Sequence, residues 1–153
     1  MSNNYTREEN MAVSAVISSG IKSQFPDLYR DCKADFDTLF GDEDMLSDAN
    51  ELFVNLLYVS NFICSYKMFR YLVHTHCNTM IGMRELALEC MRDPETEIVD
   101  VNIFKMCIRY CGKMTVEDMF CIIESLQRNN HKGLARTYRK RVEAMIRQKH
   151  DLA

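Results

Sequence analysis

Apolar residues recur at spacings of three and four along most of the chain, which is the period of an amphipathic helix. No run alternates apolar and polar positions with β-branched residues, so the pattern predicts no sheet. The protein is expected to be all-α, a compact bundle of seven or eight helices. The helical segments are expected at about 6–19, 26–40, 47–57, 61–76, 79–92, 103–111, 115–126 and 132–148.

Residues that favour helix ends divide this pattern. Thr6 followed by Glu9 has the form of a capping box, and Thr115 is placed to cap a later helix. The other helix boundaries are expected at Gly20, Pro26, Gly41, Ser47, Pro94 and Gly112. The face of the first helix that is expected to be buried consists of Ala12, Val13, Val16 and Ile17.

The most apolar part of the chain lies between residues 50 and 76. The pattern there predicts an amphipathic helix that has an acidic residue near its start. A nearly all-apolar helix follows directly, with no loop-forming residue between the two. The second of these helices, at about 61–76, has apolar residues over more than half of its circumference, which predicts a central buried helix. With 47% hydrophobic and 27% charged residues, a chain of 153 residues forms one core, so a single domain over 1–153 is expected.

Charge is distributed unevenly along the chain. Residues 1–100 hold 8 Lys or Arg and 17 Asp or Glu, a net charge of −9, whereas residues 101–153 hold 11 and 5, a net charge of +6. The basic segment has only Tyr138 between its cations, and single-strand readers need several stacking aromatics. We therefore expect a solvated basic face, and we keep a nucleic-acid or virion-associated helical protein as an alternative.

The seven cysteines are an odd number and follow the helical pattern. The N-terminal residues lack the basic and then apolar order of a signal peptide, and no apolar run is long enough to span a membrane. These features predict reduced thiols in a cytoplasmic protein.

Candidate chemistry is sparse. Neither a carboxylate pair in an apolar setting nor a nucleophile with a base is visible, so no enzymatic activity and no cofactor are expected. His74 with Cys77, and Cys107 with Cys111, have helical spacings that suit a zinc site of three Cys and one His. Nothing in the sequence forces the two pairs together, so we interpret them as ordinary half-buried residues and expect no metal.

The segment around residues 51–66 resembles a known family. Glu51-Leu52-Phe53, then Tyr58-Val59-Ser60-Asn61, then Phe62-Ile63-Cys64-Ser65-Tyr66 is similar to the first homology region of the B-cell-lymphoma-two family of apoptosis regulators. In that family a Glu-Leu-Phe triplet precedes an Asn-Trp-Gly-Arg tetrad that opens the central hydrophobic helix. Phe25 and Tyr29 are similar to the family's aromatic pair lining a groove, and Phe36 extends it.

This resemblance, over about residues 16–92, implies an anti-apoptotic protein that sequesters the amphipathic helix of pro-apoptotic host proteins in a hydrophobic groove. Asn61 stands where the family has the groove arginine, so a neutral hydrogen bond would replace a charge-assisted one. The lack of the family's membrane anchor resembles viral members, whose place is the host cytoplasm or, through partners, the mitochondria. The implied groove residues are Phe25, Tyr29, Phe36, Leu52, Phe53, Leu56 and Asn61.

The later half resembles a second family. The helix at 103–111, the segment Gly112 to Met119 and the helix from Leu134 to Val142 are similar to the later helices of a death-effector domain. The charge motif of that family would fall on His131-Lys132-Gly133-Leu134, where its aspartate is missing. This resemblance implies a decoy that blocks adaptor assembly in death-receptor signalling.

The leading hypothesis is therefore a non-enzymatic helix-binding protein, with a homodimer left open. The leucines at positions 52 and 56 repeat the spacing of a groove wall. A charged residue at position 56 is expected to abolish binding of a pro-apoptotic helix while leaving helicity largely intact.

Overall fold

The computed structural model describes residues 5–63, 65–76, 101–110 and 114–152, and these contain nine helices and no strand. The all-α class expected from the sequence is confirmed for these residues. The helix expected at 79–92, together with the boundaries at Pro94 and Gly112, lies outside them. The chain groups into two compact units, residues 1–83 and 84–153, and each is described by itself.

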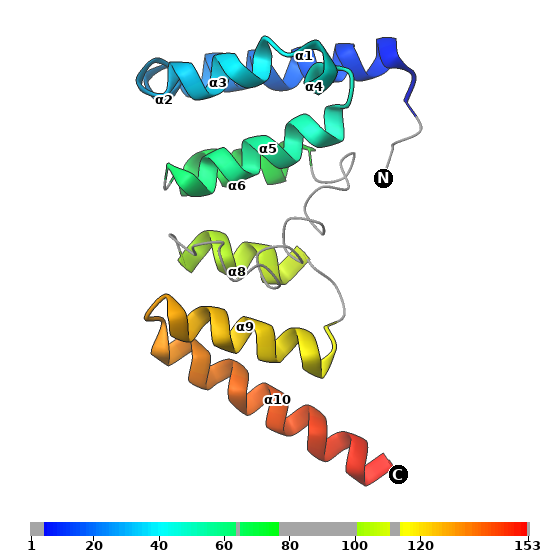
Figure 1. Ribbon diagram of the computed structural model, residues 1–153, viewed down its shortest axis with the longest axis vertical. Coiled ribbons are helices and arrows are strands. Elements are labelled where there is room, and N and C mark those ends of the chain that lie inside the picture. Colours follow the sequence, from blue (N-terminus) through cyan, green and yellow to red (C-terminus); the bar gives the residue numbers. More distant parts are fainter. Residues whose placement is uncertain (1–4, 64, 77–100, 111–113, 153) are drawn as a thin grey trace. The chain divides into compact units, whose positions relative to one another are not determined.

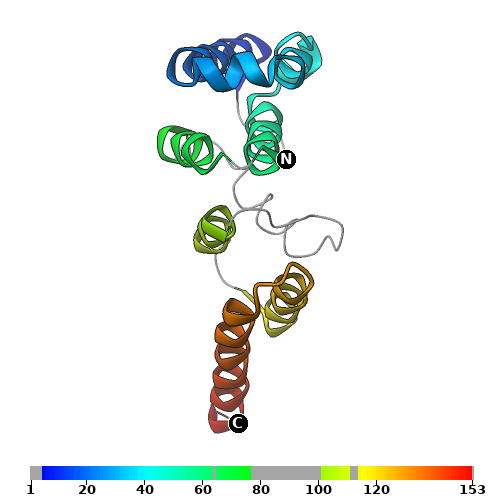
Figure 2. The same ribbon diagram turned by 90° about the vertical axis from the view of Figure 1, so that its left-hand side faces the viewer.

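The first unit has a long N-terminal helix and five shorter ones, three of which pack against it (Figure 1). Its most buried side chains include Ile17, Phe36, Leu57, Phe69 and Leu72, which have no exposed surface. Helices α5 and α6 are consecutive in the chain and pack against each other, and Figure 2 shows them end-on. The helices are α1 (Arg7–Gln24), α2 (Pro26–Asp31), α3 (Lys33–Phe40), α4 (Glu43–Leu46), α5 (Ala49–Phe62) and α6 (Tyr66–His76).

Helix α1 does not end at Gly20, as the sequence had suggested, but continues for four more residues. A Cβ atom at Gly20 would collide with the hydroxyl of Tyr71 on α6. Glycine therefore leaves room here for the end of the Tyr71 side chain and does not end the helix.

The buried face of α1 also differs from the expected one. Ile17 is buried as expected, but Val16 is 64% exposed, and the polar residues Asn10 and Ser14 are buried. The Asn10 side-chain oxygen accepts a hydrogen bond of 3.1 Å from the amide of Ala49. The Ser14 hydroxyl donates one of 2.7 Å to the carbonyl of Leu46. Two polar side chains thus attach α1 to the junction of α4 and α5.

The segment between residues 26 and 48 is more broken than the apolar pattern predicted. The expected helix at 26–40 divides at Cys32, and the acidic connector after Gly41 forms the short helix α4, capped by Asp42. Asp48, not Ser47, caps α5, because its carboxylate accepts a hydrogen bond from the amide of Glu51 at 3.2 Å. Ser47 instead ends α4.

The expected helix at about 61–76 is also corrected. Residues 61 and 62 belong to α5, and α6 begins only at Tyr66. The break is held by the amide of Ser65, which donates to the carbonyl of Ser60 at 2.9 Å. Phe62, which was expected to be buried, is 78% exposed at the end of α5. The central position of this segment in a single bundle stays a prediction.

In the second unit, two antiparallel helices join at a tight turn in which Asn130 adopts a positive φ of 62°. The amide of His131 closes this turn by donating to the carbonyl of Leu126 at 2.8 Å. Phe104 and Tyr138 meet edge to face at 6.4 Å between centroids, which packs α8 against α10. The helices are α8 (Val101–Tyr110), α9 (Val116–Arg128) and α10 (Lys132–Leu152), the last longer than the expected 132–148.

The cap of α9 is confirmed, and it gives a first test of the fold. The Thr115 hydroxyl accepts from the amide of Asp118 at 3.1 Å, and the Asp118 carboxylate accepts from the amide of Thr115 at 3.2 Å. Thr115→Ala should lower the free energy of unfolding by about 1 kcal/mol, measured by chemical denaturation. Thr137→Ala, an exposed site within α10, should change it by less than about 0.5 kcal/mol. Equal effects would contradict the capping role.

Candidate functional site

The structure places the seven predicted groove residues in two different settings. Phe36, Leu52, Phe53 and Leu56 have no exposed surface and lie in the core of the first unit. The side chains of Phe25, Tyr29 and Asn61 are half-buried. A partner can therefore contact the half-buried side chains directly. The fully buried ones can only support the surface from beneath.

Aromatic rings connect several of these residues. The rings of Tyr29 and Phe36 lie 5.8 Å apart between centroids, and Phe40 stacks on both at 6.4 and 6.0 Å. Phe25 meets Tyr71 of α6 edge to face at 5.4 Å. Phe25 precedes the first turn of α2, where its carbonyl accepts a hydrogen bond of 2.9 Å from the amide of Tyr29, so the backbone connects the two groups of rings.

We call the half-exposed side chains of Phe25, Tyr29 and Phe40 the aromatic patch. The ammonium group of Lys22 stands 5.4 Å from the ring centroid of Tyr29 and 5.5 Å from that of Phe40. A cation at this distance is attracted to the negative face of each ring. The end of α1 therefore holds the rings of α2 and α3 in place.

A small polar network stands beside the patch. The Tyr29 hydroxyl donates a hydrogen bond of 2.5 Å to Asp37, and Lys33 forms an ion pair with the same carboxylate. The hydrogen bonds from Lys33 and then Tyr29 lower the pKa of Asp37, while the hydrogen bond to Asp37 raises the pKa of Tyr29 and that of Lys33. Since these groups are solvated, the network orients the Tyr29 ring and adds little stability.

Beneath the patch, His76 extends the aromatic contacts into the core. Its ring lies 6.5 Å from that of Tyr71 and 6.3 Å from that of Phe53, edge to face in both cases. Burial lowers the pKa of His76, so the neutral form is favoured. The patch residue Phe25 is thus connected through Tyr71 and His76 to Phe53.

Asn61 lies apart from Leu52 and Leu56 on the same helix. Residues 52 and 61 are nine positions apart on the continuous helix α5, which corresponds to a rotation of about 180° and a rise of about 13 Å. The position expected to orient a partner helix is therefore on the opposite side of α5 from Leu52.

The candidate metal ligands fall partly outside the described residues. Cys77 and Cys111 lie outside the described residues, whereas His74 is exposed on α6 and Cys107 is buried on α8. Within the residues that the structure describes, no group of three His, Cys, Asp or Glu side chains is arranged to hold a metal ion. Cys32, Cys107 and Cys121 are thiols and form no disulfide.

The cations of α10 are exposed along the helix, and its aromatic residue is not available for stacking on a base. Tyr138 is only 5% exposed, and the Arg141 guanidinium covers its ring at 4.9 Å. Met145 and Leu134 are half-buried on the same side as Val142. This basic helix starts where the sequence predicted it, and its role as a solvated face stays a prediction.

Three contributors to the patch were missed in the sequence. Lys22 and Tyr71 approach the rings from α1 and α6, and no spacing along the chain indicates such contacts. Phe40 carries a local signal, because it follows Phe36 by one helical turn and so shares its face.

None of the helices in the described ranges combines the length and apolarity needed to cross a lipid bilayer. Comparison of the chain with models of known protein families, with curated proteins and with solved structures gave no match.

Proposed function

We propose that the protein is a non-enzymatic binding module that captures an amphipathic helix of a partner protein on the aromatic patch. The observation that carries this proposal is the half-exposed group of Phe25, Tyr29 and Phe40 above a fully buried support that includes Phe36. Large rings that are pre-positioned but not covered supply contact area at low entropic cost, and aromatic residues dominate binding hot spots.

The polar surroundings indicate which kind of helix fits. Residues 1–83 hold six Lys or Arg and eleven Asp or Glu, a net charge of −5. Asp27, Asp31 and Asp35 are exposed on the helices that carry the patch. A partner helix with apolar anchors on one face and basic residues at its edges complements this surface.

The class of partner rests on the sequence resemblance to apoptosis regulators. We propose that the captured helix belongs to a pro-apoptotic host protein and that its sequestration inhibits apoptosis. The single bundle around α6 expected from the sequence is part of this proposal, because it would keep the support of the patch rigid. The groove role of Asn61 is replaced here by Tyr29 and its link to Asp37, which stand at the patch itself.

The test is titration calorimetry of the full chain with a panel of pro-apoptotic helix peptides. Phe40→Ala should lower the affinity for the tightest-binding peptide about tenfold or more, because hot-spot truncations cost about 2 kcal/mol of binding free energy. Phe62→Ala removes an equally large ring that is 78% exposed at the far end of α5, and it should leave affinity unchanged. Affinity should also fall as salt is raised.

Melting curves of both variants separate binding from folding. The proposal fails if no peptide of the panel binds the parent protein. It also fails if Phe62→Ala and Phe40→Ala, both folded, reduce affinity equally.

A further inference from the structure

A pocket on the second unit is lined mainly by cations. Its volume is about 450 Å³, and its lining residues are Gln127 of α9 and Lys132, Ala135, Arg136 and Arg139 of α10. Small-ligand sites in proteins have volumes of about 300–1,000 Å³. The pocket is therefore large enough for a small molecule. It belongs to the second unit and has no part in the aromatic patch of the first unit.

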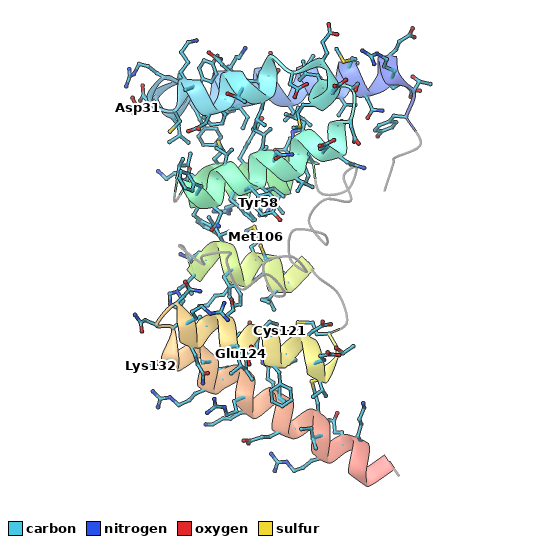
Figure 3. All side chains as sticks on the ribbon, in the orientation of Figure 1. Asp31, Tyr58, Met106, Cys121, Glu124 and Lys132 are labelled. Carbon is cyan, nitrogen blue, oxygen red and sulfur yellow. The ribbon has the colours of Figure 1, made fainter. Side chains whose placement is uncertain are left out.

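The three cations lie on one stripe of α10. Positions 132, 136 and 139 are four and three residues apart, so they project from the same face over about 10 Å of helix. All three side chains are exposed, and within the described part of the chain they form no ion pair. Figure 3 shows Lys132 at the start of α10, where the helix dipole adds to the positive potential.

The floor and the opposite wall are short and neutral. Ala135 is 2% exposed and has no side chain beyond Cβ, which leaves the space between the helices open. Gln127 adds an amide that can donate a hydrogen bond from α9. Guanidinium, ammonium and amide groups, which the side chains lining this space carry, are donors that bind phosphate oxygens.

Two carboxylates stand at one end of the site, on the side away from the turn between α9 and α10. Glu143 follows Arg139 by one turn of α10, and Glu124 precedes Gln127 by one turn of α9, where Figure 3 labels it. An extended nucleic-acid strand that continued along the helices away from this turn would meet these negative charges, and it would find Tyr138 buried. The cationic stripe suits an anion that is compact.

We propose that this pocket binds a compact ligand carrying two or more phosphate groups. Arg136 and Arg139 hold phosphate oxygens through paired donors, Lys132 contributes a point charge, and Gln127 fixes the orientation from α9. The site is independent of helix capture by the first unit.

The test uses inorganic triphosphate as the probe and calorimetry of the full chain at low and at physiological salt. Arg136→Gln with Arg139→Gln should weaken triphosphate binding at least about tenfold, since two charge-assisted contacts are lost. The matched control is Lys140→Gln with Arg147→Gln, which removes the same charge from α10 outside the pocket and should change affinity less than about twofold. All four side chains are exposed, so both variants should have the same melting temperature as the parent protein.

Further arms distinguish the ligand classes. Orthophosphate should bind more weakly than triphosphate, and a single-stranded oligonucleotide should not bind at physiological salt. Absence of triphosphate binding, or an equal loss in the two double variants, would overturn the proposal, as would tighter binding of the oligonucleotide. If the variant Arg136→Gln with Arg139→Gln melts at a lower temperature than the parent protein, the single change Lys132→Gln must still weaken triphosphate binding for the proposal to stand.

Discussion

Leu56→Asp should unfold most of the first unit instead of merely removing a binding contact. Leu56 has no exposed surface, so the change deletes a core side chain and buries an unpaired carboxylate. The lost packing costs about 2–5 kcal/mol and the buried charge several more, which approaches the whole stability of a typical domain. This corrects the expectation that a charge at this position leaves helicity largely intact, because that expectation assumed a side chain at a groove mouth.

The measurement is far-ultraviolet circular dichroism with thermal melting of the full chain. Phe62→Asp introduces the same carboxylate into the same helix at a side chain that is 78% exposed, and it should cost no more than about 1 kcal/mol. Similar melting of Leu56→Asp and the parent protein would mean that Leu56 is not in the core.

Two buried asparagines should respond in opposite directions to the same substitution. Asn10 is 7% exposed, and its side chain accepts from the amide of Ala49 and donates to the carbonyls of Thr6 and Tyr5. Asn50 is 5% exposed, and neither its amide nitrogen nor its oxygen has a hydrogen-bond partner within the described residues. Each Asn is thus the control for the other.

Asn10→Leu should lower the free energy of unfolding by about 2 kcal/mol or more, because it leaves the buried amide of Ala49 without an acceptor. Asn50→Leu should raise it by about 1 kcal/mol, because it removes a polar group that was buried without compensation. Chemical denaturation of the three proteins measures both changes. Destabilisation by both substitutions would show that Asn50 has a polar partner.

The features that the sequence predicts well are those with a local cause. The capping box at Thr6 was predicted because both of its halves lie within three residues, and the cap at Thr115 was predicted because a threonine directly precedes an apolar helical run. The helical class follows from the apolar period in the same way. By contrast, the role of Gly20 depends on Tyr71, and the burial of Asn10 and Ser14 depends on partners 39 and 32 residues away, which no periodic pattern contains.

The candidate site shows the same division. The family resemblance predicted Phe25 and Tyr29 as an aromatic pair lining a groove, and both side chains are half-exposed in the structure. The apolar spacing of Leu52 and Leu56 is equally compatible with a groove wall and with a core, and only packing decides between them. In the structure both leucines lie fully inside, so the accessible surface moves to the rings of α2 and α3.

The attachment of α1 through Asn10 and Ser14 also constrains how the chain acquires its structure during synthesis. The acceptor for Ser14 is at Leu46 and the donor for Asn10 is at Ala49, so they emerge 32 and 39 residues after these two side chains. At roughly 5–20 residues per second, the nascent α1 waits about 2–8 s before its polar face can be satisfied. The hairpin of α9 and α10 joins residues close in sequence and needs no such delay. Compared with this hairpin, the N-terminal helix thus stays exposed for longer before it docks.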